Sequence, residues 1–395
     1  MERYDSYKDS GVEWIGEIPS HWRNSKTNFL SSNYDGKRVP LNGTQRSEME
    51  GEIPYWGSNG VVDYINKSMF NEELVLVGED GSPFFDIYKP ISFKVTGDVW
   101  INNHIHVLKH KESEVLPDFL VHSFNITDFK EFITGSTRDK LTQSDLSRIP
   151  HFLPPLSEQQ QIVSFLDTKT SLIDSLIEKT QQKIELLKEK RQKLVEEVVL
   201  NDKIERVRLE HVVDLVKRPI NREDNETYNK IGMYNWGRGI FKYPTEEGSE
   251  LGDSTFNFIK EGDLLLSGQF SWEGSVSMVG KEVHNCISSH RFHILMGRKD
   301  IILNEYLWSY FTSQEGHFLL TENSFGSSGR NQPLNIGRLL KEKIPIPELS
   351  FQLKIKELVE YTRRFEKHSK RNIELLKEYR QSLISEVVTG KRKVV

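Results

Sequence analysis

The stretch KIELLKEKRQKLVEEVV, residues 183–199, returns without a gap as NIELLKEYRQSLISEVV at residues 372–388. The two segments share IELLKE, RQ, a leucine and EVV at a separation of 189 residues. Upstream, PPLSEQQQI at 154–162 matches PELSFQLKI at 347–355 at a separation of 193 residues. The first copy therefore carries four extra residues between the two matches, about one turn of an α-helix.

Both copies have the pattern of one long helix. Prolines precede each segment, no proline or glycine interrupts either one, and Ser157 and Ser350 stand where a serine can cap a helix start. Apolar residues recur every three to four positions, as in a coiled-coil seam. The sequence predicts two helices of about 40 residues that pair antiparallel. The predicted seam consists of Ile173, Ile177, Ile184, Leu187, Leu194, Val198, Ile373, Leu376, Leu383 and Val387.

Two questions about these helices stay open in the sequence. They could instead be a pair of ordinary surface helices. Arg191 and Arg380 interrupt the seam at equivalent positions. Each either fixes the register of the pair or extends its charged end into solvent.

The repeat extends weakly into the segments before the helices. LVLVG at 74–78 resembles LLLSG at 264–268, and WINNHIHVL at 100–108 resembles CISSHRFHIL at 286–295. Helical patterns follow at 116–132 and 303–320. We therefore predict an α+β fold with an internal pseudo-two-fold duplication, in which two globular mixed α/β domains are separated by the two helices. The predicted boundaries are 1–153 and 201–346 for the modules, and 154–200 and 347–395 for the helices.

Length and charge agree with two folded modules and limit how they could bind nucleic acid. A chain of 395 residues exceeds one typical core. Its net charge is -5, with 16 Lys and Arg against 23 Asp and Glu in residues 1–150, and 18 against 20 in residues 201–345. Because phosphate binding needs nearby cations, DNA binding would depend on local basic loops or on a basic partner.

Several features favour the cytoplasm. The lone cysteine, Cys286, cannot form an internal disulfide. No apolar run reaches the roughly 18 residues that a membrane span needs, and residues 1–10 lack the apolar core of a signal peptide. The sequence thus predicts a cytoplasmic protein without a membrane partner.

Loops rich in aromatic, amide and basic residues are the candidate binding sites. Asn and Gln can read adenine edges, Arg can read guanine, and Lys or Ser can hold phosphates. Trp56 and Trp236 could equally be core residues. The predicted DNA contacts are Lys37, Arg38, Trp56, Ser58, Asn59, Asn103, His104, Arg138 and Lys140 in the first module, and Trp236, Arg238, Gln269, Trp272, His290, Arg291, Arg330 and Asn331 in the second.

The sequence gives little support for a catalytic or metal-binding site. His104 and His106 alternate on one expected strand, but no convincing acidic ligand spacing accompanies them, so we predict no metal site. The sequence contains no Walker-type loop, no G-x-G-x-x-G fingerprint and no G-x-S-x-G elbow. It also lacks the Asn-Pro-Pro-aromatic or Asp-Pro-Pro-aromatic tetrapeptide of amino-methyltransferases. We predict no catalytic residue in this chain.

The chain resembles the specificity (S) subunits of type I restriction-modification systems. The resemblance is carried by the opening YKDSGVEWIGEIPSHW at 7–22, by PPLSEQQQI and by the IELLKEKRQ segment. The second copy departs from the pattern at Glu348, where the first has proline, and at Phe351, where the first has Glu158.

That resemblance implies a non-catalytic subunit with two target recognition domains. Each domain would read one half of a bipartite target in double-stranded DNA, and the paired helices would set the spacing. Two methylation (M) subunits per chain, carrying S-adenosylmethionine, would flip the target adenine. Restriction (R) subunits would bring ATP- and Mg-dependent translocation and cleavage, so this chain would bind no cofactor itself. The alternatives are a coiled-coil adaptor that binds proteins and, less well supported, a stand-alone nuclease.

Overall fold

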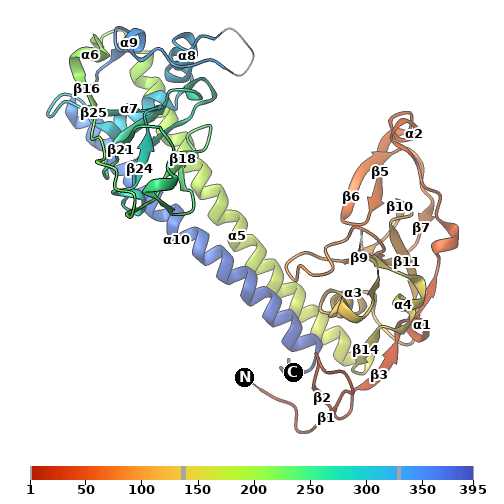
Figure 1. Ribbon diagram of the computed structural model, residues 1–395. Coiled ribbons are helices and arrows are strands. Elements are labelled where there is room, and N and C mark those ends of the chain that lie inside the picture. Colours follow the sequence, from red (N-terminus) through yellow and green to blue (C-terminus); the bar gives the residue numbers. More distant parts are fainter. Residues whose placement is uncertain (1, 135–138, 327–330, 395) are drawn as a thin grey trace. The chain divides into compact units, whose positions relative to one another are not determined.

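The structure is a computed structural model that describes residues 2–134, 139–326 and 331–394. It divides into two compact units, residues 1–179 with 370–395 and residues 180–369. Each unit contains one globular module and a part of both long helices, α5 (Leu156–Val199) and α10 (Leu349–Val388) (Figure 1). The predicted boundaries separate modules from helices, which is a different partition of the chain, and they stay a prediction.

The two long helices pair antiparallel, as predicted. In the first unit, Arg380 Nε lies 3.1 Å from Asp174 Oδ1, and in the second, Lys188 Nζ lies 3.2 Å from Glu366 Oε1. Early residues of one helix therefore lie beside late residues of the other. Helix α5 has 44 residues and α10 has 40. This difference equals the four-residue offset between the two sequence matches.

The burial of side chains along both helices follows the predicted apolar seam. Ile173, Val198, Leu383 and Val387 are buried, and the other six seam positions are half-buried. The leucines on the opposite side are exposed, as at Leu172, Leu176, Leu186 and Leu375. Such a narrow buried stripe is the pattern expected of a helix covered along one side by a partner helix.

Arg191 does not extend into solvent. It is 9% exposed, its guanidinium carbon lies 4.0 Å from the centre of the Trp308 ring, and Nη1 donates to Thr312 Oγ1 at 2.9 Å. Burial, and then the charge of Arg363, lower the pKa of Arg191 to about 10. Arg191 therefore joins helix α5 to the second module by a cation–π contact.

The first module is built on two four-stranded sheets (Figure 1). One has the order β4-β11-β8-β9 and is antiparallel, with β4 (Ser31–Asn33), β11 (Ile105–His110), β8 (Leu74–Gly78) and β9 (Ser92–Val95). The other has the order β6-β5-β10-β7, with β6 (Gly60–Ile65), β5 (Glu50–Gly57), β10 (Asp98–Ile101) and β7 (Phe70–Asn71). Because alternate residues of β8 face opposite sides, Val75 and Val77 join the core around the helices, whereas Leu74 and Leu76 join a second core between the sheets.

The second module repeats the first of these sheets. Its order is β16-β25-β22-β23, with β16 (Val213–Val216), β25 (Phe292–Gly297), β22 (Leu264–Ser267) and β23 (Val276–Met278). Short two-stranded sheets take the place of the other sheet, formed by β17 (Thr227–Tyr228) with β20 (Glu246–Glu247), β18 (Ile231–Met233) with β19 (Ile240–Lys242), and β21 (Phe256–Phe258) with β24 (Ile287–Ser289). The duplication is thus strong at the helices and weaker away from them.

The pairing of the strands shows that the match of residues 74–78 with 264–268 is displaced by one residue. Leu108 pairs with Val75 in the first module, and Leu295 pairs with Leu264 in the second. Val75, not Leu74, therefore corresponds to Leu264. A one-residue slip would exchange the two faces of the strand, so core packing fixes this register.

The helical pattern at 116–132 was predicted too long, and the pattern at 303–320 is not a single helix. The first is helix α3 (Pro117–Asn125) followed by a short 3-10 turn, η2 (Phe129–Glu131), capped by Asp128. The second divides into α7 (Asn304–Phe311) and α8 (Gln314–Glu322). The Ser313 side chain accepts from Gly316 N at the start of α8, so a capping residue inside the apolar pattern begins a new helix.

A buried glutamine fastens the start of each long helix to its module. Both helices begin one residue before the predicted serine caps, at Leu156 and Leu349. The side-chain nitrogen of Gln159 donates to Pro154 O at 3.0 Å, and Gln352 donates to Pro347 O at 2.9 Å. The two glutamines are 1% and 0% exposed.

The opening segment explains where the second copy departs from the first. In the first unit, Glu158 accepts hydrogen bonds from Tyr4 Oη at 2.6 Å and Trp22 Nε1 at 3.1 Å, and its other oxygen lies 2.8 Å from His21 Nε2. The segment that supplies these groups comprises β1 (Tyr7–Asp9), β2 (Glu17–Pro19) and their flanking residues. The second unit has no counterpart of it before β15 (Arg206–Arg208), so Phe351 needs no such partners.

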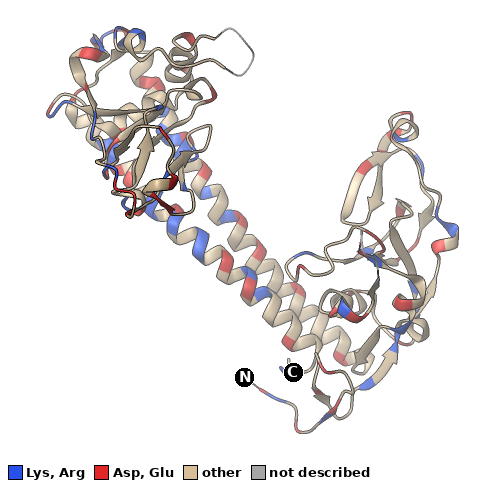
Figure 2. Cartoon of the chain, viewed as in Figure 1, with Lys and Arg blue, Asp and Glu red and all other residues tan. Residues whose placement is uncertain are grey.

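Length alone does not make the long helices membrane segments. Within residues 2–134, 139–326 and 331–394, no helix is both long enough and apolar enough to cross a bilayer. Lys, Arg, Asp and Glu recur along α5 and α10 (Figure 2).

Candidate nucleic-acid interface

In the first unit, segments far apart in sequence meet beyond the end of β8. Asn102 N donates to Trp56 O at 2.9 Å, and Ser82 Oγ donates to Ser58 O at 3.2 Å. Strand β13 (Lys140–Leu141) joins them, because Leu141 N donates to Glu79 O at 2.8 Å. We call residues 56–59, 79–82, 102–104 and 140 the first rim. It brings together Trp56, Ser58, Asn59, Asn103, His104 and Lys140 of the predicted contacts.

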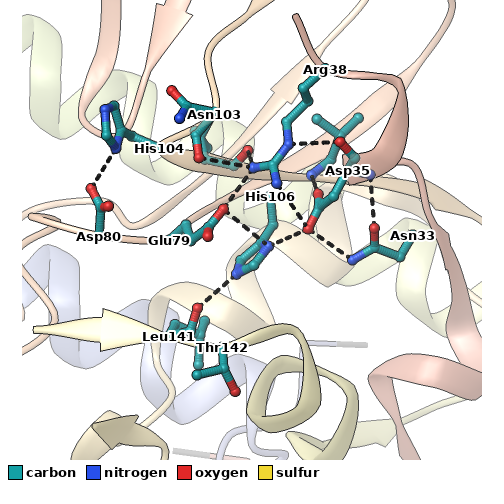
Figure 3. A network of polar contacts seen from close by, with 12 residues as sticks. Asn33, Asp35, Arg38, Glu79, Asp80, Asn103, His104, His106, Leu141 and Thr142 are labelled. Carbon is teal, nitrogen blue, oxygen red and sulfur yellow. Dashed lines mark hydrogen bonds and ion pairs between the residues drawn. The ribbon is translucent and has the colours of Figure 1, made fainter. Parts of the chain in front are cut away.

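Arg38 packs against this rim, and its guanidinium donates hydrogen bonds to groups of the protein itself (Figure 3). Its Nη1 donates to Glu79 Oε2 at 2.7 Å, Ile105 O at 2.8 Å and Asn103 O at 3.2 Å. The side chain is 10% exposed. Because these acceptors occupy the guanidinium, Arg38 fixes the loops that carry other candidates. Its predicted role as a base reader stays untested.

His106 completes the buried network under the rim (Figure 3). Its Nδ1 lies 2.6 Å from Asp35 Oδ2, and its Nε2 lies 2.9 Å from Leu141 O. Both partners only accept hydrogen bonds, so the ring satisfies them together when both nitrogens carry protons. Burial raises the pKa of the Asp35 carboxyl, but the hydrogen bond and charge of His106 are among the interactions that bring it below its ordinary value.

Three ligand atoms in this network are close enough to hold a cation. One atom each from Asp35, Glu79 and His106 lies within 4.8 Å of the others. Arg38, with Nη1 on Glu79 and Nη2 3.5 Å from Asp35 Oδ2, already places a positive charge between the carboxylates. The geometry therefore fits a self-contained ion network, and the prediction of no metal remains an expectation.

Several candidates of the first unit reach solvent. The side chain of His104 is 40% exposed, with Nδ1 2.8 Å from Asp80 Oδ1, and that of Lys140 is 49% exposed, with Nζ 3.3 Å from Glu79 Oε1. Asn59, Asn103 and Lys37 are exposed as well. The acidic pair at 79–80 was missed from the sequence. The signal was its position directly after a fully buried strand, where loop residues meet neighbouring loops.

Trp56 is mainly a packing residue. It is half-buried, and its ring centre lies 5.4 Å from that of Phe93. Trp56 also packs against the core between the two sheets. This placement favours the alternative that it belongs to the core.

In the second unit, a matching set of loops meets beyond the end of β22. The turn between β18 and β19 contacts the loop that follows β22, because Trp236 N donates to Glu273 O at 3.0 Å. Leu334 N donates to Gly268 O at 2.8 Å and brings in the segment that begins at Asn331. We call residues 234–238, 268–274, 290–291 and 331–334 the second rim.

The second rim places amide and basic side chains side by side. Arg291 Nη1 donates to Gln269 Oε1 at 3.3 Å, and Trp272 Nε1 donates to Gln269 O at 3.1 Å. The Arg238 guanidinium carbon lies 5.6 Å from the Tyr234 ring centre. His290, Arg291, Arg238 and Asn331 are exposed, and Gln269 and Trp272 are half-buried. Arg138 and Arg330 lie outside the described residues.

The two rims differ in chemistry although their scaffolds match. With Leu108 equivalent to Leu295, His106 corresponds to His293. Burial lowers the pKa of His293, and among the described residues no carboxylate forms an ion pair with it. The residues that define the first rim include Lys140 with Glu79 and Asp80, and those of the second include Arg238 and Arg291 with Glu273, so neither set is strongly basic. Lys and Arg are interspersed with Asp and Glu along the chain as a whole (Figure 2). Each arrangement can offer hydrogen bonds to base edges but few charges to phosphates.

Known proteins match most of the chain. Residues 32–186 fit a family model described as the type I restriction modification DNA specificity domain. A Haemophilus influenzae protein, named as a type I restriction enzyme specificity subunit, is 29% identical over 334 residues, which are 82% of this chain and 83% of that protein.

Two solved structures share the fold. One is the S subunit of a type I restriction-modification system from M. genitalium, with a TM-score of 0.53, 13% identity, and 93% and 96% of the two chains covered. The other comes from a study of complex assembly in a type I system, with a TM-score of 0.58, 15% identity, and 94% and 98% covered. The shared fold spans both units.

Proposed function

We propose, from the premise that this chain belongs to the family of type I restriction-modification specificity subunits, that its two rims each read one half of a bipartite DNA target. The observation that carries the proposal is the pair of rims on matched scaffolds. Each rim joins four loops beyond the same strand of a repeated sheet, yet the exposed side chains differ. Two equivalent surfaces with different donors and acceptors suit two different half-sites.

We further propose that the paired helices set the distance between the half-sites. A continuous helix rises about 1.5 Å per residue, so its length fixes a span as loops do not. The four-residue difference between α5 and α10 would then be part of the spacing.

Partner subunits would supply the chemistry and much of the phosphate binding. We propose two methylation subunits per chain, carrying S-adenosylmethionine and acting on adenine, and restriction subunits that use ATP and Mg. This chain would bind no cofactor and catalyse no step, consistent with the non-catalytic character of its family. The net charge of -5 supports a division of phosphate binding between this chain and its partners. Binding to phosphates releases counterions only where Lys or Arg lie beside them, and the rims contain few of these residues.

Methylome sequencing tests the proposal directly. The chain is expressed with its methylation subunit in cells that lack other adenine methylation, and methylated positions are mapped. We expect one motif with two specific parts separated by unspecific positions. A methylome without a two-part motif would contradict the proposal.

A coiled-coil adaptor for protein partners is the second candidate, motivated by the lack of strongly basic modules. A gel shift at stated salt separates the two, using the complex with methylation subunits, the mapped motif and a scrambled duplex. The specificity function predicts preference for the motif, whereas the adaptor predicts none.

A further inference from the structure

We propose that Trp236 stacks on a nucleobase of the half-site read by the second unit. The inference rests on the proposed function and deepens it, because it names the kind of contact that one side chain of the second rim makes. Trp236 lies in the turn between β18 and β19 and is 69% exposed. All seven tryptophans lie in the described residues, and Trp236 is the one that is exposed, although tryptophan is usually largely buried.

The backbone of Trp236 adopts a conformation that tryptophan disfavours. Its φ is 60°, in the left-handed region where Cβ crowds the backbone. In the same turn, Gly237 has φ 62° and Gly239 has φ 112°, and glycine removes that penalty. A glycine at position 236 would suit the turn and expose no apolar surface. Folding of the turn therefore does not explain the indole.

The turn that carries Trp236 is held against the loop after β22. In addition to the bond from Trp236 N to Glu273 O, Gly237 N donates to Gly274 O at 2.9 Å. A Cβ at Gly274 would lie 3.2 Å from Trp236 Cα, so the two backbones touch. A side chain on a fixed support loses little freedom when it binds.

An imidazole ring supports the indole from one side. The rings of Trp236 and His317 lie 5.1 Å apart between centres, with 31° between their planes. His317 Nε2 lies 3.0 Å from Trp272 O and can only donate to that carbonyl, which orients the ring. A base turned out of the duplex could extend this partial stack, as unpaired bases stack on aromatic platforms in proteins that bind single strands.

The side chains around Trp236 favour a nucleobase over an apolar protein surface. Arg238, His290 and Arg291 are exposed in the same rim, and Gln269 is half-buried there. These groups donate to phosphates and base edges. At the corresponding turn of the first unit, Trp56 packs on Phe93 instead. Among the described residues of the two rims, only the second therefore has an exposed indole.

The test uses the complex with methylation subunits and a duplex carrying its methylated motif. Trp236→Ala and Trp236→Gly remove the ring, Trp236→Phe keeps an aromatic ring, and Phe318→Ala removes another exposed aromatic residue, 62% exposed on α8, as the matched control. We expect affinity to fall about ten-fold or more for Ala and Gly, to stay within about three-fold for Phe, and to be unchanged for the control.

A second readout locates the contact. With 2-aminopurine placed in turn at positions of the second half-site, one position should change fluorescence on binding, and Trp236→Ala should abolish that change. Unchanged affinity of Trp236→Ala would overturn the stacking, as would loss of assembly with the methylation subunits, which would assign the indole to a protein contact. If the methylome shows a two-part motif but Trp236→Ala keeps its affinity, only the stacking is contradicted. If no two-part motif is found, the proposed function is contradicted.

Discussion

The side-chain oxygen of Gln159 accepts a hydrogen bond from Leu116 N at 2.9 Å, at the start of helix α3. Gln352 makes the same contact with Leu303 N at 2.8 Å, at the start of α7. One buried amide in each unit therefore binds the start of a long helix, through a proline carbonyl, to the start of a module helix. The amide satisfies donors and acceptors that would otherwise be buried without partners.

Replacing Gln159 with leucine should destabilise the first unit by about 1–3 kcal/mol, because Leu116 N and Pro154 O lose their partner inside the protein. Urea unfolding measures the loss. Gln160→Leu, at the exposed neighbouring position, is the control and should change stability little. Equal effects of the two substitutions would show that helix propensity, not the buried amide, is responsible.

Replacing Arg38 with alanine should also destabilise the first unit, by about 3 kcal/mol, because Glu79 and Asp35 would be left buried with one cationic partner fewer. Lys67→Ala, at an exposed position of the same module, should leave stability within about 0.5 kcal/mol. If Arg38→Ala instead keeps full stability and relaxes one base of the motif, Arg38 is a reader after all.

The buried His151 should make the first unit sensitive to acid. Burial lowers the pKa of His151 to about 3 from an ordinary value of 6.5. Its ring nitrogens lie 3.0 Å from Thr27 Oγ1 and 2.7 Å from Ser123 Oγ. Between pH 6.5 and 3 the unfolded chain binds a proton that the folded chain does not, so stability falls as pH falls.

The contribution of this histidine is about 1.4 kcal/mol per pH unit in that window. We expect the stability gap between the native protein and His151→Gln to narrow by that slope as the pH is lowered, and to be constant above pH 7. Unfolding measured across this range checks it. A gap independent of pH would mean that His151 binds a proton in the folded protein as readily as in the unfolded chain.

Deleting residues 180–183 should shift the spacing of the target and leave its two parts intact. The deletion gives α5 the 40-residue length of α10 and removes about 6 Å of helix, roughly two base pairs of duplex. The control replaces the same four residues with alanine, which keeps the length. A methylated motif with unchanged spacing would rule out the helices as its determinant.

Replacing Arg291 with alanine should relax the motif at one position of one half-site, at a cost of about 1–3 kcal/mol for the preferred base. Lys299→Ala removes another exposed cation from the same module and should leave the motif unchanged. Methylome sequencing of both variants distinguishes them. Uniformly weaker methylation without relaxed specificity would make Arg291 a phosphate contact.

The helices could be predicted from sequence because their signals are local and repeated. Continuous periodicity and the absence of proline define α5 and α10, and the four-residue offset gave their difference in length. The modules were predictable only in outline. The register of Val75 with Leu108 depends on which face meets the core, and Ser313 begins a new helix inside an apolar pattern.

Side-chain roles were hardest to predict, because they depend on contacts between distant segments. Arg38 was predicted to contact DNA because a basic loop residue is usually exposed, and its contact with Glu79, 41 residues away, has no signal in the sequence. Trp56 and Trp236 occur in similar sequence contexts, yet one packs inward and the other is exposed. The backbone φ of Trp236, which no sequence pattern signals, separates them.

The matched glutamine contacts have an evolutionary consequence. Within the described residues, each glutamine, the helix start that it holds and the core around it belong to one unit. Substitutions in one rim therefore leave the anchoring of the other module untouched. Because both anchors are built alike, mutation or recombination can change one rim while the other unit keeps its anchor.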